Sequence, residues 1–149
     1  MISGLTLLSF GSKKQKEEYL PKVTSDGLII TLANSAGRPN GEDRLDKKNG
    51  GLELSGSKLF IPYATVADRI LYHCSSARDN VFFLVDTRIR GIRINPLTTI
   101  ASDRQYEVIF DRAEVTEENI VGQRGKGKEI SSKIEEWGAL FHCAFILGL

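Results

Sequence analysis

Residues 56–68 read GSKLFIPYATVAD, and this stretch decides how the middle of the chain folds. Together with the residues before it, LELSGSKLFI (52–61) has the alternation of a hairpin, with a turn at Ser55-Gly56-Ser57 and a return strand over Lys58–Ile61. Successive side chains of a strand point to opposite faces. We therefore expect either Leu59 or Phe60 to point away from the core that this strand covers.

The same sequence pattern, short apolar runs separated by turn residues, extends from Gly27 to about Asp111. The strongest hairpin signal within it is Asn49-Gly50. This spacing predicts a mainly β fold, an antiparallel β-barrel or sandwich, flanked by an N-terminal helix and a C-terminal amphipathic helix. We divide the chain into a helical lead-in (1–24), a β domain (25–124) and one further helix (125–149). The expected strands contain LIITLA (28–33), GLEL (51–54), KLFI (58–61), RILYHC (69–74), VFFLVD (81–86), IRIN (92–95) and YEVIFD (106–111).

Capping chemistry predicts where the N-terminal helix starts and stops. Ser12 and Gln15 have the spacing of a reciprocal capping pair, so the helix begins there. Pro21 lacks an amide hydrogen and restricts the residue before it, so we expect the helix to end at or just after Tyr19-Leu20.

The C-terminal segment has apolar residues at steps of three and four, which is the pattern of an amphipathic helix. No C-cap signal follows, and no later element of the sequence covers the apolar face. We expect either a chain cut from a longer one or a helix that pairs with itself. The stripe consists of Ile130, Ile134, Trp137, Phe141, Ala144, Phe145 and Gly148.

Composition sets the broad class. The chain has 149 residues, 41% of them hydrophobic, and a formal net charge of +1, so no global field draws it to nucleic acid or to anionic lipid. The first ten residues are apolar but too short to span a bilayer and carry no basic leader, so we expect a cytoplasmic protein without membrane contact. Cys74 and Cys143 are expected to be reduced and buried, a disulfide or a metal being the minority reading, and no metal site is predicted.

Three chemical readings compete on the residues alone. Ser75 or Ser76, with His73 or His142 and an aspartate, could supply the catalytic triad of a hydrolase. No serine, however, has the strand-turn-helix context of a nucleophile elbow. The segment GQRGKGKE (122–129) leads into a helix and is either a phosphate site or, more in keeping with its sequence, an exposed hinge. A nucleic-acid platform is disfavoured, because basic residues alternate with acidic ones on the first helix.

Four motifs in order resemble the flavin-dependent acyl-CoA dehydrogenase family. FGSKKQKEEYLPKV (10–23) is similar to the segment that enters the family's middle domain, and LSGSKLFIPYATVAD (54–68) resembles its Asn-Gly-x-Lys-x-Phe-Ile signature. FFLVD (82–86) is similar to its central strand, and SDRQYEVIFDRAEVTEENIVGQRGKG (102–127) to the end of its middle domain. The resemblance covers nearly the whole chain.

The resemblance implies a β-barrel middle domain with flanking helices that holds FAD and an acyl-CoA thioester between helical domains. In the family a glutamate removes the α proton of the thioester while the flavin takes the β hydride. This chain would supply the middle domain, the last helix before it and the first helix after it. The partners implied are an acyl-CoA thioester, an electron-transfer partner that the sequence does not name, and further copies of the chain, joined through the C-terminal helix.

The resemblance also assigns cofactor and substrate contacts. Thr31 and Leu32 fall on the strand that contacts the flavin and the acyl group, although Leu32-Ala33-Asn34 replaces the family's Thr-Glu-Pro and Thr31 is displaced by one position. Gly37 is retained from the following Gly-Ser-Asp loop. Arg38 takes the place of its serine and is a candidate substrate contact.

Within residues 56–68, Phe60 matches the family's aromatic residue that packs on the flavin, and Ile61 matches its neighbour. Pro62 stands where the family usually has a threonine or serine that hydrogen-bonds the ring. Proline has neither a hydroxyl nor an amide hydrogen, so two bonds to the flavin are lost. Each loss costs about 1 kcal/mol net.

The C-terminal helix departs from the family as well. Ala139 stands where an arginine is common, and Gly138 where some branches carry the catalytic glutamate. Glu136 is the nearby candidate for a substrate contact, but a helix turns by about 100° per residue, so it faces elsewhere than position 138. We assign no catalytic residue within the chain.

The leading hypothesis is therefore a middle-domain fragment or truncated relative of an acyl-CoA dehydrogenase that contributes one wall of the flavin and acyl-CoA pocket. By itself the chain is expected to be inactive and to bind FAD weakly or undetectably. The alternative is a non-catalytic β scaffold or assembly module derived from that family. Whether the chain takes part in an enzyme stays open at this point.

Overall fold

The computed structural model describes residues 1–149 apart from 35–41, 49, 77, 101–102 and 149. The helices are α1 (Ile2–Phe10), α2 (Lys13–Ser25), the short 3₁₀ helix η1 (Glu117–Asn119) and α3 (Gly127–Ile146). The strands are β1 (Ile30–Ala33), β2 (Arg44–Lys48), β3 (Gly51–Pro62), β4 (Arg69–Ser75), β5 (Asn80–Asp86), β6 (Ile92–Leu97), β7 (Gln105–Val115) and β8 (Ile120–Val121).

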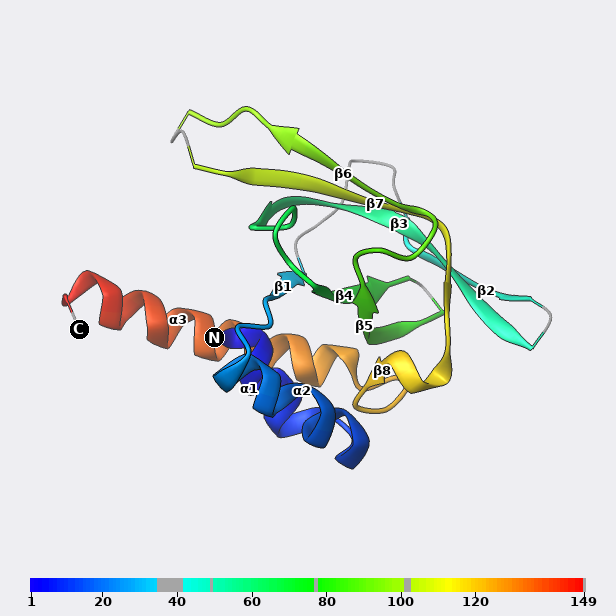
Figure 1. The fold of residues 1–149 in the computed structure, drawn as a ribbon, viewed down its shortest axis with the longest axis horizontal. Coiled ribbons are helices and arrows are strands. Elements are labelled where there is room, and N and C mark those ends of the chain that lie inside the picture. The colour runs from blue at the N-terminus through cyan, green and yellow to red at the C-terminus, as the bar shows by residue number, and fades with distance from the viewer. Residues whose placement is uncertain (35–41, 49, 77, 101–102, 149) are drawn as a thin grey trace.

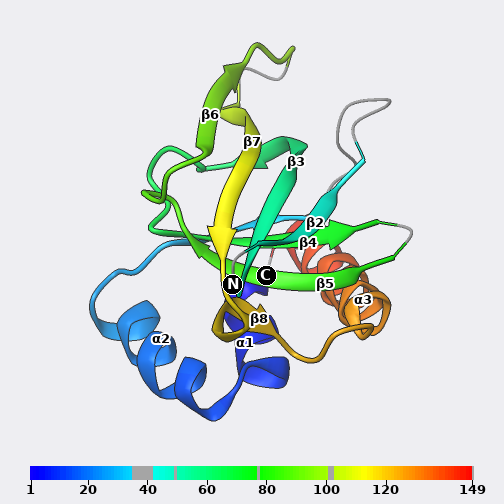
Figure 2. The ribbon, with the colours of Figure 1, turned by 90° about the vertical axis from the view of Figure 1, so that its right-hand side faces the viewer.

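The elements form three layers (Figure 1). One four-stranded sheet has the order β1-β4-β5-β8 and the other the order β2-β3-β7-β6. The helices cover the outer face of the first sheet, and Figure 2 shows that the strands of the two sheets run in different directions. The predicted antiparallel-rich sheets and flanking helices are thus present, in a mixed α/β structure with two sheets. The described residues form no closed barrel, so that alternative is not confirmed.

The strand pairing corrects one detail of the prediction. All paired strands were expected to be antiparallel, but β1 runs parallel to β4, with Ile30 opposite Arg69 and Ala33 opposite Tyr72. A parallel neighbour requires a crossover connection. Here β2 and β3 of the other sheet lie in the sequence between the two strands, so the crossover passes through the second layer.

Two cores lie on the two faces of the first sheet, which explains why the run VFFLVD is apolar without alternation. Phe83 and Tyr72 belong to the cluster between the sheets, whereas Phe82 and Leu71 belong to the cluster under the helices. All four side chains are fully buried. The sheet interior is therefore buried on both sides, and the helices are part of the same folded unit.

The hairpin expected at Ser55-Gly56-Ser57 is wrong. Residues 51–62 form one strand, β3, whose partners are β2 and β7. Gly56 makes a bulge instead of a turn, and its backbone lies so close to the Asp43 and Tyr72 side chains that a Cβ would overlap both. The hairpin signal at Asn49-Gly50 is the correct one, since Lys48 pairs with Gly51 across it, although Asn49 itself lies outside the described residues.

The N-terminal region contains two helices where one was expected. The capping pair of Ser12 and Gln15 is present at the start of α2, as predicted. The predicted end of this helix is wrong, because α2 continues through Pro21 to Ser25. Tyr19 and Leu20 pack against the core under the helices, and this tertiary contact outweighs the lost backbone hydrogen bond.

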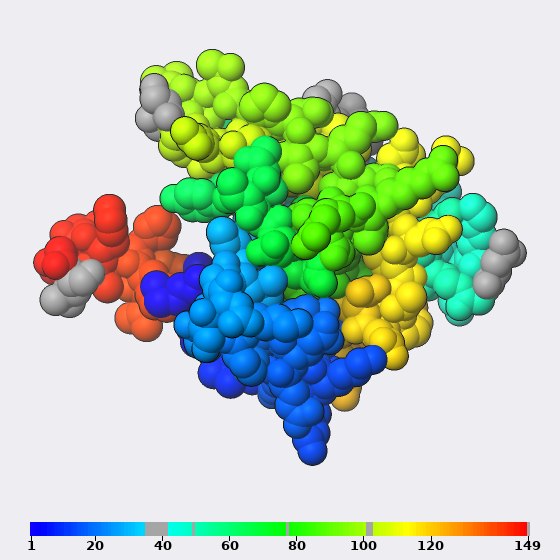
Figure 3. Space-filling view, viewed as in Figure 1, coloured from blue at the N-terminus to red at the C-terminus, as the bar shows by residue number. Residues whose placement is uncertain are grey.

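The C-terminal helix α3 follows the predicted stripe only in its first half. Ile130 and Ile134 are buried in the core under the helices, and Trp137 packs against it. The last turns project from the body (Figure 3), with Phe145 81% exposed. The expectation that the helix has no C-cap is wrong: it ends at Ile146, Leu147 is its C-cap, and Gly148 has a φ of +75°.

Cys74 is fully buried, as predicted, but the prediction that Cys143 is buried is wrong. Cys143 lies on the projecting part of α3, where the sheet no longer covers the helix. Among the described residues, no helix is both long and apolar enough to cross a membrane.

Candidate functional site

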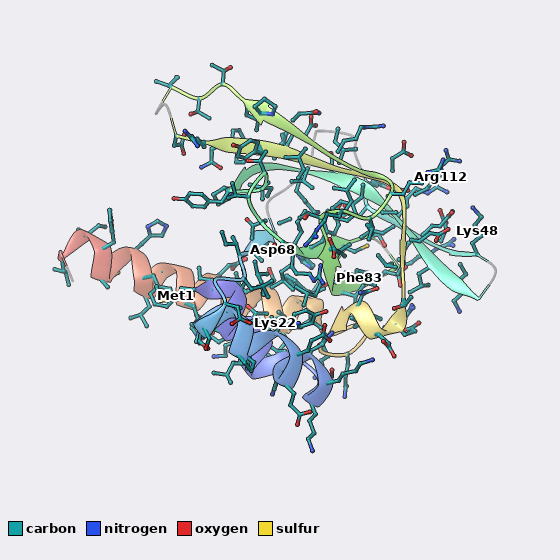
Figure 4. All side chains as sticks on the ribbon, viewed as in Figure 1. Met1, Lys22, Lys48, Asp68, Phe83 and Arg112 are labelled. Carbon is teal, nitrogen blue, oxygen red and sulfur yellow. The ribbon has the colours of Figure 1, made fainter. Side chains whose placement is uncertain are left out.

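A mainly apolar hollow of about 430 Å³ lies where β1, the end of β3, α1 and α3 meet. We call it the β1–α3 hollow. Figure 4 labels one of its lining residues, Met1, beside α3. None of the described lining residues carries a carboxylate or a basic side chain. They are Met1, Ile2, Ser3, Ile29, Ile30, Thr31, Leu32, Pro62, Tyr63 and Phe141.

The end of the stretch 56–68 holds β1 in place beside the hollow. The Ile29 carbonyl oxygen accepts the amide hydrogens of Asp68 and Arg69, at 2.9 and 3.2 Å. The Ile29 amide in turn donates to the Asp68 carboxylate at 3.0 Å. The small residues Ala64 and Ala67 are buried in this loop. These residues of the family signature therefore have a structural role, which is to start β1 in register with β4.

Thr31 joins the two sequence segments that were predicted to contact the flavin. Its hydroxyl donates a hydrogen bond of 2.7 Å to the Pro62 carbonyl oxygen, and its side chain is only 6% exposed. The hydroxyl hydrogen is thus already used within the protein. Because Pro62 has no amide hydrogen, this part of the hollow wall offers few hydrogen-bond donors to a ligand.

Two exposed aromatic residues beside Pro62 have an unusual backbone. Phe60 and Tyr63 have φ angles of +58° and +57°, and their side chains are 62% and 65% exposed. A left-handed conformation costs a non-glycine residue about 1–3 kcal/mol and is concentrated at functional sites. The β3–β7 register shifts between Lys58 and Ile61, so a bulge directs the Phe60 ring away from the core.

The predicted site residues are only partly brought together. Thr31, Leu32 and Pro62 line the β1–α3 hollow, and Phe60 is exposed two residues before Pro62. Ile61 is 1% exposed and packs in the core between the sheets, so only its backbone is available. Gly37 and Arg38 lie outside the described residues.

The remaining predicted residue, Glu136, is not among those that line the hollow. Its carboxylate lies 2.6 Å from the Lys133 ammonium group on the exposed face of α3. Sequence reasoning missed Tyr63 and the α1 residues of the wall. Phe141 was recognised only as a member of the apolar stripe.

Lys58, the lysine of the family signature, belongs to a buried polar cluster. Its ammonium group lies 2.7 Å from the Asp43 carboxylate, which also accepts the Tyr72 hydroxyl at 2.6 Å and the Ser75 amide at 2.8 Å. Burial, together with the nearby Asp43 charge, raises the pKa of Tyr72. The hydroxyl therefore stays protonated and donates. Asp43 was not noticed in the sequence, because its three donors come from distant positions.

The other chemical readings find little support in the geometry. The His73 ring nitrogens contact Asn34 and Asn80, so neither of these two contacts joins His73 to a serine of the hydrolase constellation. In the segment 122–129, Arg124 pairs with Glu117 and Asp79, and Lys126 pairs with Glu129. These cations are already engaged within the protein, which favours the hinge over the phosphate site.

Comparisons with known proteins place this fold. No protein-family model matches the chain. The crystal structure of an acyl-CoA dehydrogenase from Geobacillus kaustophilus superposes with a TM-score of 0.77 at 24% identity, covering 87% of this chain and 38% of that one. The ChsE4–ChsE5 complex from Mycobacterium tuberculosis gives a TM-score of 0.80 at 17% identity, covering 88% and 38%. The fold is thus that of a region of acyl-CoA dehydrogenases.

Two curated relatives show that the similarity to acyl-CoA dehydrogenases extends to the amino-acid sequence. An acyl-CoA dehydrogenase from Bacillus subtilis (strain 168) is 30% identical over 96% of this chain and 41% of its own length. A glutaryl-CoA dehydrogenase from Desulfococcus multivorans is 30% identical over 84% of this chain and 36% of its own length. The homologues of the chain are thus acyl-CoA dehydrogenases, and it spans about two fifths of the length of these relatives.

Proposed function

We propose that the chain forms one wall of the pocket in which an acyl-CoA dehydrogenase holds FAD and an acyl-CoA thioester for α,β-dehydrogenation. The observation that carries the proposal is that Thr31, Leu32 and Pro62 line one hollow. They come from two segments that are distant in sequence, and the family resemblance assigns both segments to the same ligands.

The lining of the β1–α3 hollow suits the alkyl part of a thioester. Its volume of about 430 Å³ is within the usual range of small-molecule sites, which is about 300–1,000 Å³. None of the described lining residues has a charged side chain, so the phosphates of CoA have no side-chain partner in the hollow and would lie outside it. We infer a substrate with an uncharged, mainly apolar acyl group.

The residues fit the face of a flavin better than its polar edge. The exposed Phe60 and Tyr63 rings offer aromatic surface on which a flat ring system can stack. The polar edge of the flavin would find fewer hydrogen-bond donors, because Pro62 has no amide hydrogen and the Thr31 hydroxyl already donates to the Pro62 carbonyl oxygen. FAD, when bound, supplies the acceptor for the β hydride. This chain's residues would orient the ring, and binding to the chain alone is expected to be weak.

Proton abstraction needs a base that the described wall does not supply. Its described lining residues carry no carboxylate or imidazole, and Glu136 is paired with Lys133 on another face. A base, the flavin and the thioester must be held in one geometry for the reaction. We therefore expect this chain alone to show no turnover of an acyl-CoA.

Replacing Pro62 with threonine is expected to strengthen FAD binding. The substitution restores a hydroxyl and an amide donor, each worth about 1 kcal/mol, so affinity should rise by about 30-fold. Flavin fluorescence measured during titration of the chain into FAD gives the two dissociation constants. Pro96→Thr is the matched control, because Pro96 is an exposed proline on β6. An unchanged affinity in Pro62→Thr would contradict the assignment of Pro62 to the flavin contact.

A second candidate, a non-catalytic scaffold, is favoured by the same Pro62 and by the engaged Thr31 hydroxyl. The two candidates differ in what the hollow binds. A scaffold would bind neither FAD nor a long-chain acyl-CoA, and its Pro62→Thr variant would gain nothing. The pocket wall would bind both weakly, and the variant would bind FAD more tightly.

We further propose that copies of the chain associate through α3. Its end exposes the apolar residues Leu140, Phe145, Ile146 and Leu147, at 64–81% exposure. Sedimentation equilibrium is expected to show self-association that Phe145→Lys abolishes. Glu135→Lys, on the exposed polar face of the same helix, is the control and should leave association unchanged. A wild-type chain that is monomeric at high micromolar concentration would refute this interface.

A further inference from the structure

A buried polar network connects the first sheet with α3. His73, on β4, is 8% exposed, and its ring stacks on Phe82 with centroids 4.3 Å apart. Its Nδ1 lies 2.6 Å from the Asn34 side-chain oxygen, and its Nε2 lies 3.0 Å from the Asn80 side-chain oxygen. Both ring nitrogens of this buried histidine therefore have polar partners from neighbouring strands.

Both asparagines lead to the first turns of α3. The Asn34 amide nitrogen donates to the Ser131 hydroxyl at 3.3 Å. Asn80 lies against Gly127, the first residue of the helix, so closely that a Cβ on Gly127 would overlap it. The network thus joins the end of β1, the middle of β4, the start of β5 and the start of α3.

The protonation state of the His73 ring determines which groups of the network donate hydrogen bonds. Burial lowers the pKa of His73, and the Lys58 charge adds to this effect, while the Asn80 hydrogen bond and the Asp43 charge oppose it. A neutral imidazole has one donor and one acceptor. Since the Asn34 amide nitrogen donates to Ser131, its oxygen accepts from Nδ1–H. The Asn80 atom that faces Nε2 is also an oxygen, so a neutral ring that donates to Asn34 does not donate to Asn80.

Apart from Gly127, which lies against Asn80, the buried residues described on α3 are apolar. Ile130 and Ile134 enter the core under the helices, and Trp137 packs against it. Apolar contacts are non-directional and tolerate rotation or sliding of a helix, whereas hydrogen bonds fix a register. Among the described residues, the path from His73 through Asn34 to Ser131 therefore supplies the directional restraint on how α3 sits.

We propose that His73 is a positioning residue which, through Asn34 and Ser131, sets the rotation and axial position of α3 on the first sheet. The effect of this positioning on ligand binding in the β1–α3 hollow rests on the proposed function. Phe141 lies ten residues beyond Ser131, about 15 Å along the helix, so a small rotation at Ser131 displaces the Phe141 ring from its place opposite β1.

Trp137 is the only tryptophan of the chain and provides the test without any ligand. It lies on α3, with its ring centroid 6.5 Å from that of Phe10. We expect Asn34→Ala, Ser131→Ala and His73→Gln each to shift the emission maximum of the folded chain to longer wavelength. The double variant Asn34→Ala/Ser131→Ala should shift no further than either single one. Ser131→Thr, which keeps the hydroxyl, should restore the wild-type spectrum.

Ser132→Ala, at an exposed neighbouring position of the same helix, is the control and should leave the spectrum unchanged. Far-UV circular dichroism establishes that each variant is folded. If the folded variants keep wild-type emission and only melt at lower temperature, the network is merely structural and the proposal is wrong. If the emission shifts but neither wild type nor variant binds an acyl-CoA, the positioning stands and the proposed function fails. If the Asn34 or His73 variant does not fold, the emission maxima of Ser131→Ala and Ser131→Thr still test the proposal.

Discussion

Replacing Asp43 with alanine is expected to lower the free energy of unfolding by about 3–5 kcal/mol, because it leaves a buried charge without its partner. The Lys58 and Asp43 side chains are 6% and 3% exposed, so water cannot take over the lost contact. The Tyr72 hydroxyl and the Ser75 amide would lose their acceptor at the same time. This substitution therefore combines an unpaired buried charge with unsatisfied donors.

Urea unfolding, followed by circular dichroism, measures this loss. Asp46→Ala is the control, since the Asp46 carboxylate is more than half exposed and 3.7 Å from Arg44, and it should change stability by less than about 1 kcal/mol. The double variant Asp43→Ala/Lys58→Met should recover part of the loss, because it removes the stranded charge. A loss at Asp43 no larger than that at Asp46 would show that the cluster does not hold the sheets together.

Replacing Phe83 with alanine is expected to destabilise the chain by about 3–5 kcal/mol, because a fully buried ring leaves a cavity that its neighbours fill only in part. Phe83 is 0% exposed and lies between the two sheets, as labelled in Figure 4. Its neighbours in that core come from both sheets, among them Leu54, Val108 and Tyr72. The two sheets form the walls of this cavity and cannot close it without shifting.

Phe60→Ala is the matched control for the same chemical change. Phe60 is 62% exposed and has a positive φ, so its truncation should change stability by no more than about 1 kcal/mol. Thermal or urea unfolding of both variants gives the comparison. Equal losses at Phe60 and Phe83 would contradict the assignment of Phe83 to the core and of Phe60 to the surface.

Local sequence signals predicted the elements well where neighbouring residues decide them. The capping pair Ser12 and Gln15 and the strand VFFLVD depend on short-range chemistry, and both are present. The turn at Gly56 was wrongly predicted because the reason for that glycine is tertiary. The Asp43 side chain, from the segment before β2, and the Tyr72 side chain, from β4, need the space that a Cβ would fill. Pro21 was misread in the same way, since a packed Tyr19-Leu20 face keeps α2 intact.

The site was predictable only along the segments that carry family motifs. Thr31, Leu32 and Pro62 could be selected from the motifs, and the fold brings them to one hollow. Tyr63 and Phe141 could not, because their presence in that hollow depends on the parallel pairing of β1 with β4 and on the placement of α3. Asp43 and His73 act through partners that are distant in sequence, and one sequence carries no signal for such pairs.

Under the proposed function, the β1–α3 hollow receives the acyl part of a thioester. Amide NMR spectra of the full chain, recorded during titration with dodecanoyl-CoA, test it most directly, because this method detects even weak binding and places it on residues. We expect saturable shifts at the amides of Ile30, Thr31, Leu32 and Tyr63. Unchanged signals at these residues up to millimolar ligand, or shifts confined to other surfaces, would contradict it.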